Sequence, residues 1–115
     1  RERIPQLNRS AHLLYSAEFN APCPNAVIES LACGLPVAGY QTGALPEIVQ
    51  GDAGRLVPYG SDPWLLGKPD TIGLANAAMS ILTEQPRFRQ AARAQAESAF
   101  DVAQMAQRYL EILAG

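Results

Sequence analysis

The sequence predicts an α/β fold with a parallel sheet of about three strands flanked by helices. Three short apolar runs, at residues 11–17, 36–40 and 54–58, carry the strand signal. A helical pattern lies between the first two runs and makes a strand–helix–strand crossover, the connection that parallel strands require. Strand and helix patterns alternate early and helices fill the last third, an order that is typical of the α/β class.

The helix of this crossover is predicted over residues 24–33. Pro24 suits a first-turn position, because its missing N–H would have no intrahelical partner there. Either Cys23 or Asn25 can cap the start, so both assignments stay open. Gly34 follows directly and is expected to adopt the left-handed conformation that ends many helices.

Two faces of this helix carry different residues. Val27 and Leu31 lie four residues apart and are expected to pack on the sheet, whereas Asn25 and Glu29 share another face. The first N–H groups of a helix lack intrahelical partners and attract phosphate. Ligands of open α/β sheets bind beyond the carboxyl ends of the strands, where this helix would begin. We therefore expect Asn25 and Glu29 to face solvent or a ligand.

The segments after the second apolar run predict further elements. A short helix is expected over residues 45–50, with Pro46 in its first turn and Gly51 at its end. Residues 59–70 are rich in Gly, Pro and Asp and are expected to form a loop. The Trp-Leu-Leu triplet at 64–66 is expected to fold back on the core, and the alternative is an exposed apolar patch.

Three helices are predicted in the last third. Thr71 can cap the first, which runs to about residue 85 and is broken by Pro86. Its apolar stripe is expected to face the core and consists of Ile72, Ala75, Met79 and Leu82. The second is an Ala- and Gln-rich helix with a weak stripe. The third follows Asp101, which would form a capping box with Gln104. Its core-facing residues are expected to be Val102, Met105, Tyr109 and Ile112.

Size and charge exclude several classes of protein. The chain has 115 residues, enough for one domain and one core. Its net charge is −2 and it has no basic run, which argues against a nucleic-acid partner. No apolar stretch approaches the ~20 residues of a membrane span, and residues 1–8 are too polar for a signal peptide. Because the chain begins in mid-pattern without a Met, we expect an upstream piece.

The cysteines and the histidine do not form a disulfide or a metal site in this interpretation. Cys23 and Cys33 would flank the helix and lie ~14 Å apart, well beyond the ~7 Å that a disulfide spans. We predict two free thiols and a reducing, cytoplasmic compartment. His12, the only histidine, has no cluster of ligands around it, so metal binding is not expected.

Two surfaces are candidates for contact with partners. Arg87, Arg89 and Arg93 form a basic helix edge. It is expected to be solvated in preference to forming a phosphate site, and the further alternative is contact with an anionic membrane surface. Such a contact would make the protein peripheral to the inner membrane face. The strand at 11–17 would leave an open sheet edge, which could pair with a second copy in a homodimer.

Four segments together resemble a known family. Residues 24–37 read PNAVIESLACGLPV, residues 42–49 read TGALPEIV, residues 54–58 read GRLVP, and Phe100-Asp101 precedes the last helix. In this order they resemble the group 1 family of retaining glycosyltransferases with the GT-B fold. The resemblance covers nearly the whole chain.

The resemblance implies that residues 1–115 are the C-terminal portion of a nucleotide-sugar-binding domain. The fold would be a partial Rossmann-like sheet, half of a GT-B C-terminal domain, and this single domain would be incomplete. Basic residues that hold the pyrophosphate would lie in the missing half. A saccharide or lipid-linked acceptor would bind through a further missing domain. The resemblance implies no cofactor and no metal requirement, with a nucleoside diphosphate sugar as donor substrate.

The same resemblance assigns roles to particular residues. Glu29 matches a glutamate that hydrogen-bonds ribose hydroxyls. Pro24, Asn25 and Cys23, with Pro22 before them, match the loop whose amides lie against the sugar and phosphates. Gly43 matches the neighbouring segment, in which Glu47 is expected to be structural. Ala21, eight residues before Glu29, stands where the family carries a Glu or an Asp that contacts the donor sugar, and Glu18 has the wrong spacing to match it.

Three functional interpretations follow. The leading one is the donor-binding part of an enzyme that moves a hexosyl group from a nucleoside diphosphate sugar to a hydroxyl, with retention. This piece by itself is expected to be inactive. The alternative is a non-catalytic nucleotide-sugar-binding or assembly module whose site has degenerated at Ala21. A relative of the same fold, such as a sugar-nucleotide epimerase, ranks below both.

Overall fold

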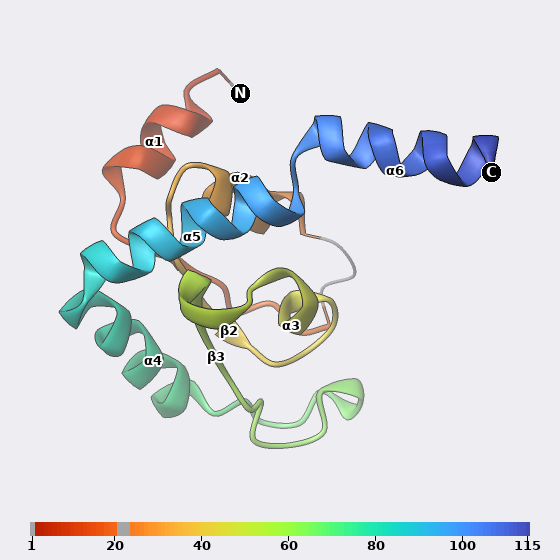
Figure 1. Ribbon diagram of the computed structural model, residues 1–115. Coiled ribbons are helices and arrows are strands. Elements are labelled where there is room, and N and C mark those ends of the chain that lie inside the picture. The colour runs from red at the N-terminus through yellow and green to blue at the C-terminus, as the bar shows by residue number, and fades with distance from the viewer. Residues whose placement is uncertain (1, 21–23) are drawn as a thin grey trace.

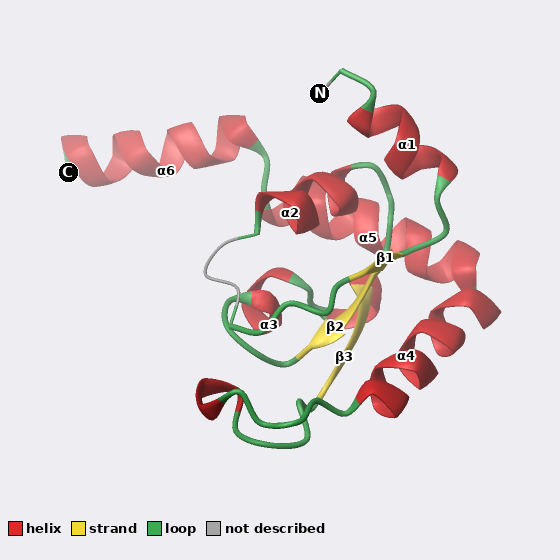
Figure 2. Cartoon of the chain, turned by 180° about the vertical axis from the view of Figure 1, so that it is seen from behind, coloured by secondary structure: helices red, strands yellow, loops and turns green. Residues whose placement is uncertain are grey.

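The computed structural model of the chain describes residues 2–20 and 24–115. Its strands are β1 (Leu14–Tyr15), β2 (Val37–Tyr40) and β3 (Gly54–Val57). They form a parallel sheet in the order β1-β2-β3, in which Val37 is in register with both Leu14 and Gly54. The predicted α/β class and three-stranded parallel sheet are confirmed (Figure 2).

Six helices surround this sheet in the described part of the chain (Figure 1). They are α1 (Ile4–Ser10), α2 (Asn25–Ala32), α3 (Leu45–Ile48), α4 (Thr71–Thr83), α5 (Gln85–Ala99) and α6 (Val102–Ala114). Two 3₁₀ turns, η1 (Gly51–Ala53) and η2 (Pro63–Leu65), complete the list. As predicted, Pro46 lies in the first turn of α3. Pro86 does not end α4 as expected, because α4 ends at Thr83 and Pro86 lies in the first turn of α5, with Glu84 between the two helices.

Strand β2 divides the core into two layers. Val37 points to one side, where it packs with α2, α3, η1 and α5 around Leu31. Ala38 and Tyr40 pack on the other side with α4 and with Phe88 of α5. All four residues of β2 are buried, as a strand covered on both faces should be. Val27 and Leu31 are buried too, which confirms the predicted core face of α2.

Two glycines are required by the backbone. Gly34 has φ +75° directly after α2, as predicted, in a conformation that favours glycine. Gly54 is the first residue of β3 and has an extended conformation that any residue can adopt. Glycine is required there because the neighbouring strand lies very close. A Cβ built on Gly54 would lie 2.1 Å from the carbonyl oxygen of Val37 on the neighbouring strand. Only glycine therefore lets β3 approach β2 at this point.

The first strand differs from its prediction. The run 11–17 is expected to be covered on both faces, but β1 contains only two residues and Tyr15 is exposed. Tyr15 is exposed because β1 is at the edge of the three-stranded sheet. An edge strand has fewer neighbours to cover it, and the open edge expected at this strand is present in the described part of the chain.

The predicted core stripe of α4 is wrong. Its buried residues are Leu74, Ala77 and Ile81, whereas Ile72, Met79 and Leu82 are exposed. The helix carries apolar residues on more than one face, so two stripes fit the helical period and packing against β2 and β3 selects between them. The cap also differs by one residue, since the Asp70 carboxylate accepts the Gly73 N–H at 2.9 Å.

The last helix is also placed differently. Asp101 caps α6 as predicted, accepting the Gln104 N–H at 3.0 Å, but the Gln104 side chain donates to the Glu97 carbonyl instead of closing a capping box. Helix α6 projects from the body and buries no residue (Figure 1). The four residues predicted to face the core, Val102, Met105, Tyr109 and Ile112, are all exposed. The pattern identified an apolar face correctly, but no described part of the chain covers it.

The Trp-Leu-Leu triplet takes the alternative that the sequence analysis ranked second. Trp64, Leu65 and Leu66 are 77%, 80% and 72% exposed, so they form an apolar patch and do not fold back on the core. Leu66 has φ +53°, a left-handed conformation that is uncommon for leucine. The patch lies on η2, at the outer end of the loop between β3 and α4 (Figure 2).

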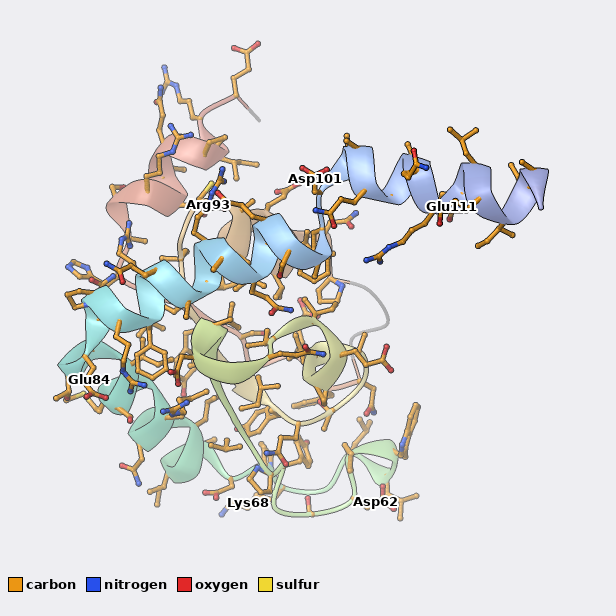
Figure 3. The ribbon with its side chains drawn as sticks, viewed as in Figure 1. Asp62, Lys68, Glu84, Arg93, Asp101 and Glu111 are labelled. Atoms are coloured by element: carbon orange, nitrogen blue, oxygen red, sulfur yellow. The ribbon has the colours of Figure 1, made fainter. Side chains whose placement is uncertain are left out.

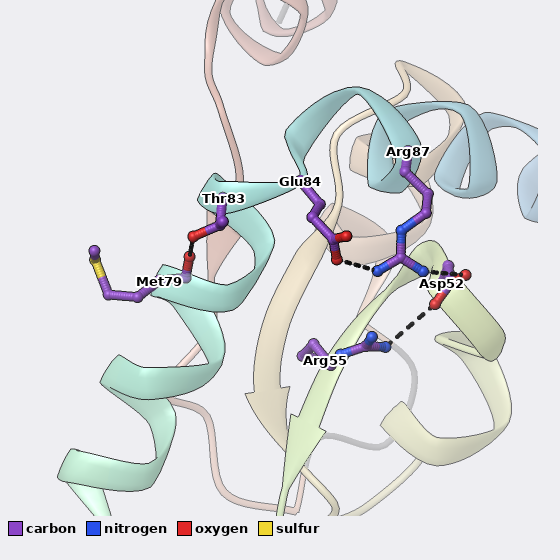
Figure 4. A network of polar contacts seen from close by, with 6 residues as sticks. All are labelled: Asp52, Arg55, Met79, Thr83, Glu84 and Arg87. Atoms are coloured by element: carbon purple, nitrogen blue, oxygen red, sulfur yellow. Dashed lines mark hydrogen bonds and ion pairs between the residues drawn. The ribbon is translucent and has the colours of Figure 1, made fainter.

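The three arginines of α5 are not a purely solvated edge. Arg87 bridges Asp52, at 2.8 Å, and Glu84, while Arg55 pairs with the same Asp52 (Figure 4). Arg89 donates to the carbonyls of Ala11, at 3.0 Å, and of Arg9. Arg93, labelled in Figure 3, pairs with Glu97 and donates to the Ala32 carbonyl at the end of α2. These side chains hold α5 against η1, α1 and α2.

Candidate functional site

The segments that follow the three strands meet at one edge of the sheet. Parallel strands share a carboxyl edge, so residues 16–24, 41–44 and 58–70 begin on the same side. Helix α2 starts at the end of the first of these segments. Asn20, in the first segment, donates its side-chain N–H to the Pro63 carbonyl in the third at 3.3 Å. A hydrogen bond therefore joins the first and third of these loops.

The described N-cap residue of α2 provides no side-chain cap. Pro24 is the N-cap residue, with φ −77° and no side-chain hydrogen bond, and its carbonyl accepts the Val27 N–H at 3.0 Å. The N–H groups of Asn25 and Ala26 are at positions that have no intrahelical acceptor. By contrast, α4 and α6 have aspartate caps at their first turns. The α2 start thus offers donors and partial positive charge to an external acceptor.

Two buried oxygens lie in the loops of this edge. Thr42 is 7% exposed, and its hydroxyl has no hydrogen-bond partner among the described residues. The Asn20 side-chain oxygen is in the same situation in the preceding segment. A buried polar atom without a partner costs free energy, so such atoms commonly mark a bound water, ion or ligand. Neither Thr42 nor Asn20 was predicted from the sequence to be a site residue, although each is a polar residue shortly after a strand run.

Gly43 follows Thr42 directly and is exposed, with φ +57°. A side chain would be strained in this conformation, and its absence opens the backbone to close approach. Gly43 is thus placed at the same sheet edge as the start of α2. Glu47 lies nearby in the first turn of α3 and is exposed.

Glu29 is one helical turn below Asn25 and is half-buried. It lines a cavity of about 280 Å³ together with Ala32 and Cys33 of α2 and with Ile4, Pro5 and Asn8 of α1. Asn25, at the helix tip, is exposed. The structure therefore puts Asn25 beside the carboxyl edge and Glu29 further along the helix, beside α1. Ala21, Pro22 and Cys23, which the sequence analysis also assigned to the site, lie outside the described residues.

An aromatic cluster lies beneath this edge. The rings of Phe19 and Tyr40 each stack edge-to-face on Tyr59, both with centroids 5.2 Å apart. Burial raises the pKa of the Tyr40 hydroxyl above its ordinary value, and the neighbouring tyrosines and Asp70 act in the same direction. Tyr40 therefore remains a neutral side chain through the neutral pH range. The cluster gives the three loops a rigid support.

The described residues contain no group of three or more His, Cys, Asp or Glu side chains that could hold a metal ion. His12 is exposed, and Cys33 is a free thiol. Across residues 2–20 and 24–115, no helix is both long enough and apolar enough to cross a membrane.

Comparison with known proteins gives two results. The family described as glycosyl transferases group 1 matches residues 1–84. N-acetyl-alpha-D-glucosaminyl L-malate synthase of Bacillus anthracis is 32% identical over 76 residues, which cover 65% of this chain. The chain spans only 18% of that relative's length. Since the family match extends over well more than half of the residues, this chain belongs to the group 1 glycosyl transferases.

Proposed function

We propose that this chain binds the nucleoside diphosphate sugar donor in a retaining glycosyltransferase with the GT-B fold. The parent protein would move a hexosyl group from this donor to a hydroxyl of a saccharide or lipid-linked acceptor. One observation carries the proposal: the uncapped start of α2 lies at the sheet edge where Thr42 and Asn20 hold buried oxygens without described partners. Donors, acceptors and an open glycine backbone at one edge suit a polar, anionic ligand.

Each residue has a role in this proposal. The amides at the start of α2, with the exposed backbone at Gly43, lie against the diphosphate and stabilise the charge that develops on it as it leaves. Asn25 contacts the donor from the helix tip. Glu29, one turn further, binds the ribose hydroxyls. Pro24 fixes the entry of the chain into the helix, and Cys23 and Ala21 belong to the loop beside the sugar. No cofactor takes part.

Titration of the chain with nucleoside diphosphate hexoses tests donor binding. The set includes the N-acetylglucosamine derivative, because the relative's printed name contains that sugar. Glu29→Gln is expected to weaken binding about tenfold, since a hydrogen bond to a charged group contributes about 1.5–3 kcal/mol. Nuclear magnetic resonance titration measures the affinity and should shift the amide signals of Asn25 and Gly43.

Glu111→Gln is the matched control, because this substitution removes one negative charge as Glu29→Gln does, but on the projecting helix α6. Its affinity should equal that of the unaltered chain. If Glu29→Gln and Glu111→Gln bound the nucleoside diphosphate hexoses with equal affinity, the proposed contact of Glu29 with the ribose would be wrong. Absence of binding by every member of the set would contradict the proposal itself. Sugar transfer by this chain alone is not expected.

A non-catalytic module is the second candidate, and Ala21 favours it. The resemblance puts a carboxylate at this position, and alanine cannot contact the donor sugar by hydrogen bonding. For an active parent we expect Ala21→Glu and Ala21→Asp to leave the transfer rate unchanged or lower it. The rate in the full-length protein measures this, with Ala103→Glu on α6 as the control. A gain of tenfold or more would instead identify a degenerate site.

The setting of the parent protein is part of the same proposal. The free thiol of Cys33 fits a reducing, cytoplasmic compartment. Pairing of the open β1 edge with a second copy would give a homodimer. Contact of the basic edge of α5 with an anionic membrane surface would make the parent peripheral to the inner membrane face. Residues 1–115 would be the C-terminal portion of the nucleotide-sugar-binding domain, with the acceptor-binding domain upstream.

A further inference from the structure

We propose that the exposed patch formed by Trp64, Leu65 and Leu66 inserts into the surface of a lipid bilayer. This inference rests on other side chains than the proposed donor site, although the loop that carries them begins at the same edge of the sheet. The three side chains are 77%, 80% and 72% exposed and adjacent in sequence, the first two in the 3₁₀ turn η2 and Leu66 as its C-cap. Tryptophan is enriched at membrane interfaces, because its ring is apolar and its N–H can still reach water.

Hydrogen bonds within the loop fix the turn that carries this patch. The Asp62 carboxylate accepts the Trp64 N–H at 2.9 Å, and the Gly67 N–H donates to the Asp62 carbonyl at 3.1 Å. The Tyr59 hydroxyl donates to the Gly67 carbonyl at 2.8 Å, and this ring belongs to the buried aromatic cluster. Leu66 completes the turn in the left-handed conformation. The apolar side chains therefore stand on a braced loop that is attached to the core.

The size of the patch favours a bilayer over a second protein. Three such side chains present on the order of 400 Å² of surface, since one fully buried aromatic accounts for 150–250 Å². A specific protein interface takes about 800 Å² from each partner. The turn is also an outer extremity of the molecule, as Figures 1 and 2 show. A small protruding apolar tip fits a fluid apolar phase better than it fits a rigid partner.

The charges around the patch indicate which lipid surface it prefers. Lys68 lies close to the tip in sequence, and Asp62 and Asp70 flank the same loop (Asp62 and Lys68 are labelled in Figure 3). The three charges sum to −1, so anionic headgroups gain nothing from this loop. The arginines of α5 are engaged in contacts with η1, α1 and α2. We therefore assign the contact to apolar insertion into a zwitterionic interface.

Trp64 is the only tryptophan of the chain, so its fluorescence reports on the tip alone. With phosphatidylcholine vesicles, we expect its emission to shift to shorter wavelength and to be quenched by lipids with brominated acyl chains. Replacing a quarter of the lipid by phosphatidylglycerol should not increase binding. The measurements contain no sugar nucleotide, so their failure and failure of the donor site are separate results.

The double variant Leu65→Ser with Leu66→Asn keeps the probe and removes its apolar neighbours, and asparagine tolerates the left-handed conformation. Vesicle partitioning should fall by tenfold or more. Met79→Ser, an exposed apolar position on α4, is the matched control and should bind as the unaltered chain does. The proposal would be overturned if brominated lipids did not quench the Trp64 emission, or if that emission were already at the shorter wavelength before vesicles are added. It would also be overturned if Met79→Ser, or Leu113→Ser on α6, reduced vesicle partitioning as much as the double variant does.

Discussion

Gly54→Ala is expected to abolish cooperative folding of the chain. The new Cβ would lie 2.1 Å from the Val37 carbonyl oxygen and 2.9 Å from a methyl group of Val49. The oxygen belongs to the backbone of the central strand, which pairs with β1 on one side and β3 on the other. It cannot move away without breaking that pairing. The loss should approach the whole stability of a small domain, about 5–15 kcal/mol.

Gly51→Ala is the matched control for this experiment. Gly51 lies three residues earlier, and a Cβ there would contact nothing within 4 Å, but its φ of +57° makes alanine strained. We expect a loss of about 1–2 kcal/mol from that strain alone. Urea denaturation followed by circular dichroism measures both variants. If Gly54→Ala unfolds at the same urea concentration as Gly51→Ala, the close approach of β3 to β2 is not what requires glycine.

Phe88→Ala is expected to lower the free energy of unfolding by about 3–5 kcal/mol. Phe88 is fully buried and joins the core layer that contains Tyr40, Leu74 and Ile81. The guanidinium groups of Arg55 and Arg87 each lie 4.7 Å from the centroid of its ring. Both arginines are also paired with Asp52, so the ring supports the ionic network of Figure 4. Removing it leaves a cavity and abolishes two cation–π contacts.

Phe88→Leu separates these two effects, because it keeps most of the apolar volume and removes the aromatic face. We expect it to cost about 1–3 kcal/mol, between the unaltered chain and the alanine variant. Leu82→Ala, at an exposed position of α4, should change stability by less than about 0.5 kcal/mol. The same denaturation experiment compares all three. An equal loss in Phe88→Leu and Phe88→Ala would show that the ring's shape, and not the cavity, dominates.

Local signals in the sequence predicted much of the fold. The crossover around α2 follows from its apolar spacing and from Gly34, whose backbone conformation is the one expected. The strand runs and the Asp101 cap are also in place. These features depend on neighbours in sequence. The α4 stripe and the packing of α6 depend on distant elements, and an amphipathic pattern does not identify what will cover an apolar face.

The candidate site shows the same division. Asn25 and Gly43 could be assigned from sequence to the carboxyl edge, because crossover topology dictates where loops after parallel strands lie. Thr42 and Asn20 could not, since their importance depends on burial without a partner, which only the structure reveals. The engagement of Arg87, Arg89 and Arg93 was missed for a similar reason. Their acceptors lie between 35 and 80 residues away in the chain, apart from the nearby carboxylates of Glu84 and Glu97.

Helix α1 forms part of the wall beside Glu29 and yet contains no buried residue. Segments with so little buried surface open locally at a small fraction of the free energy needed to unfold the core. Each such opening would remove one side of the cavity that Glu29 lines. Whatever holds α1 in place, including the contact of Arg89 with the Arg9 carbonyl, therefore adjusts the cavity that Glu29 lines. Local opening of α1 therefore changes the surroundings of Glu29 on α2.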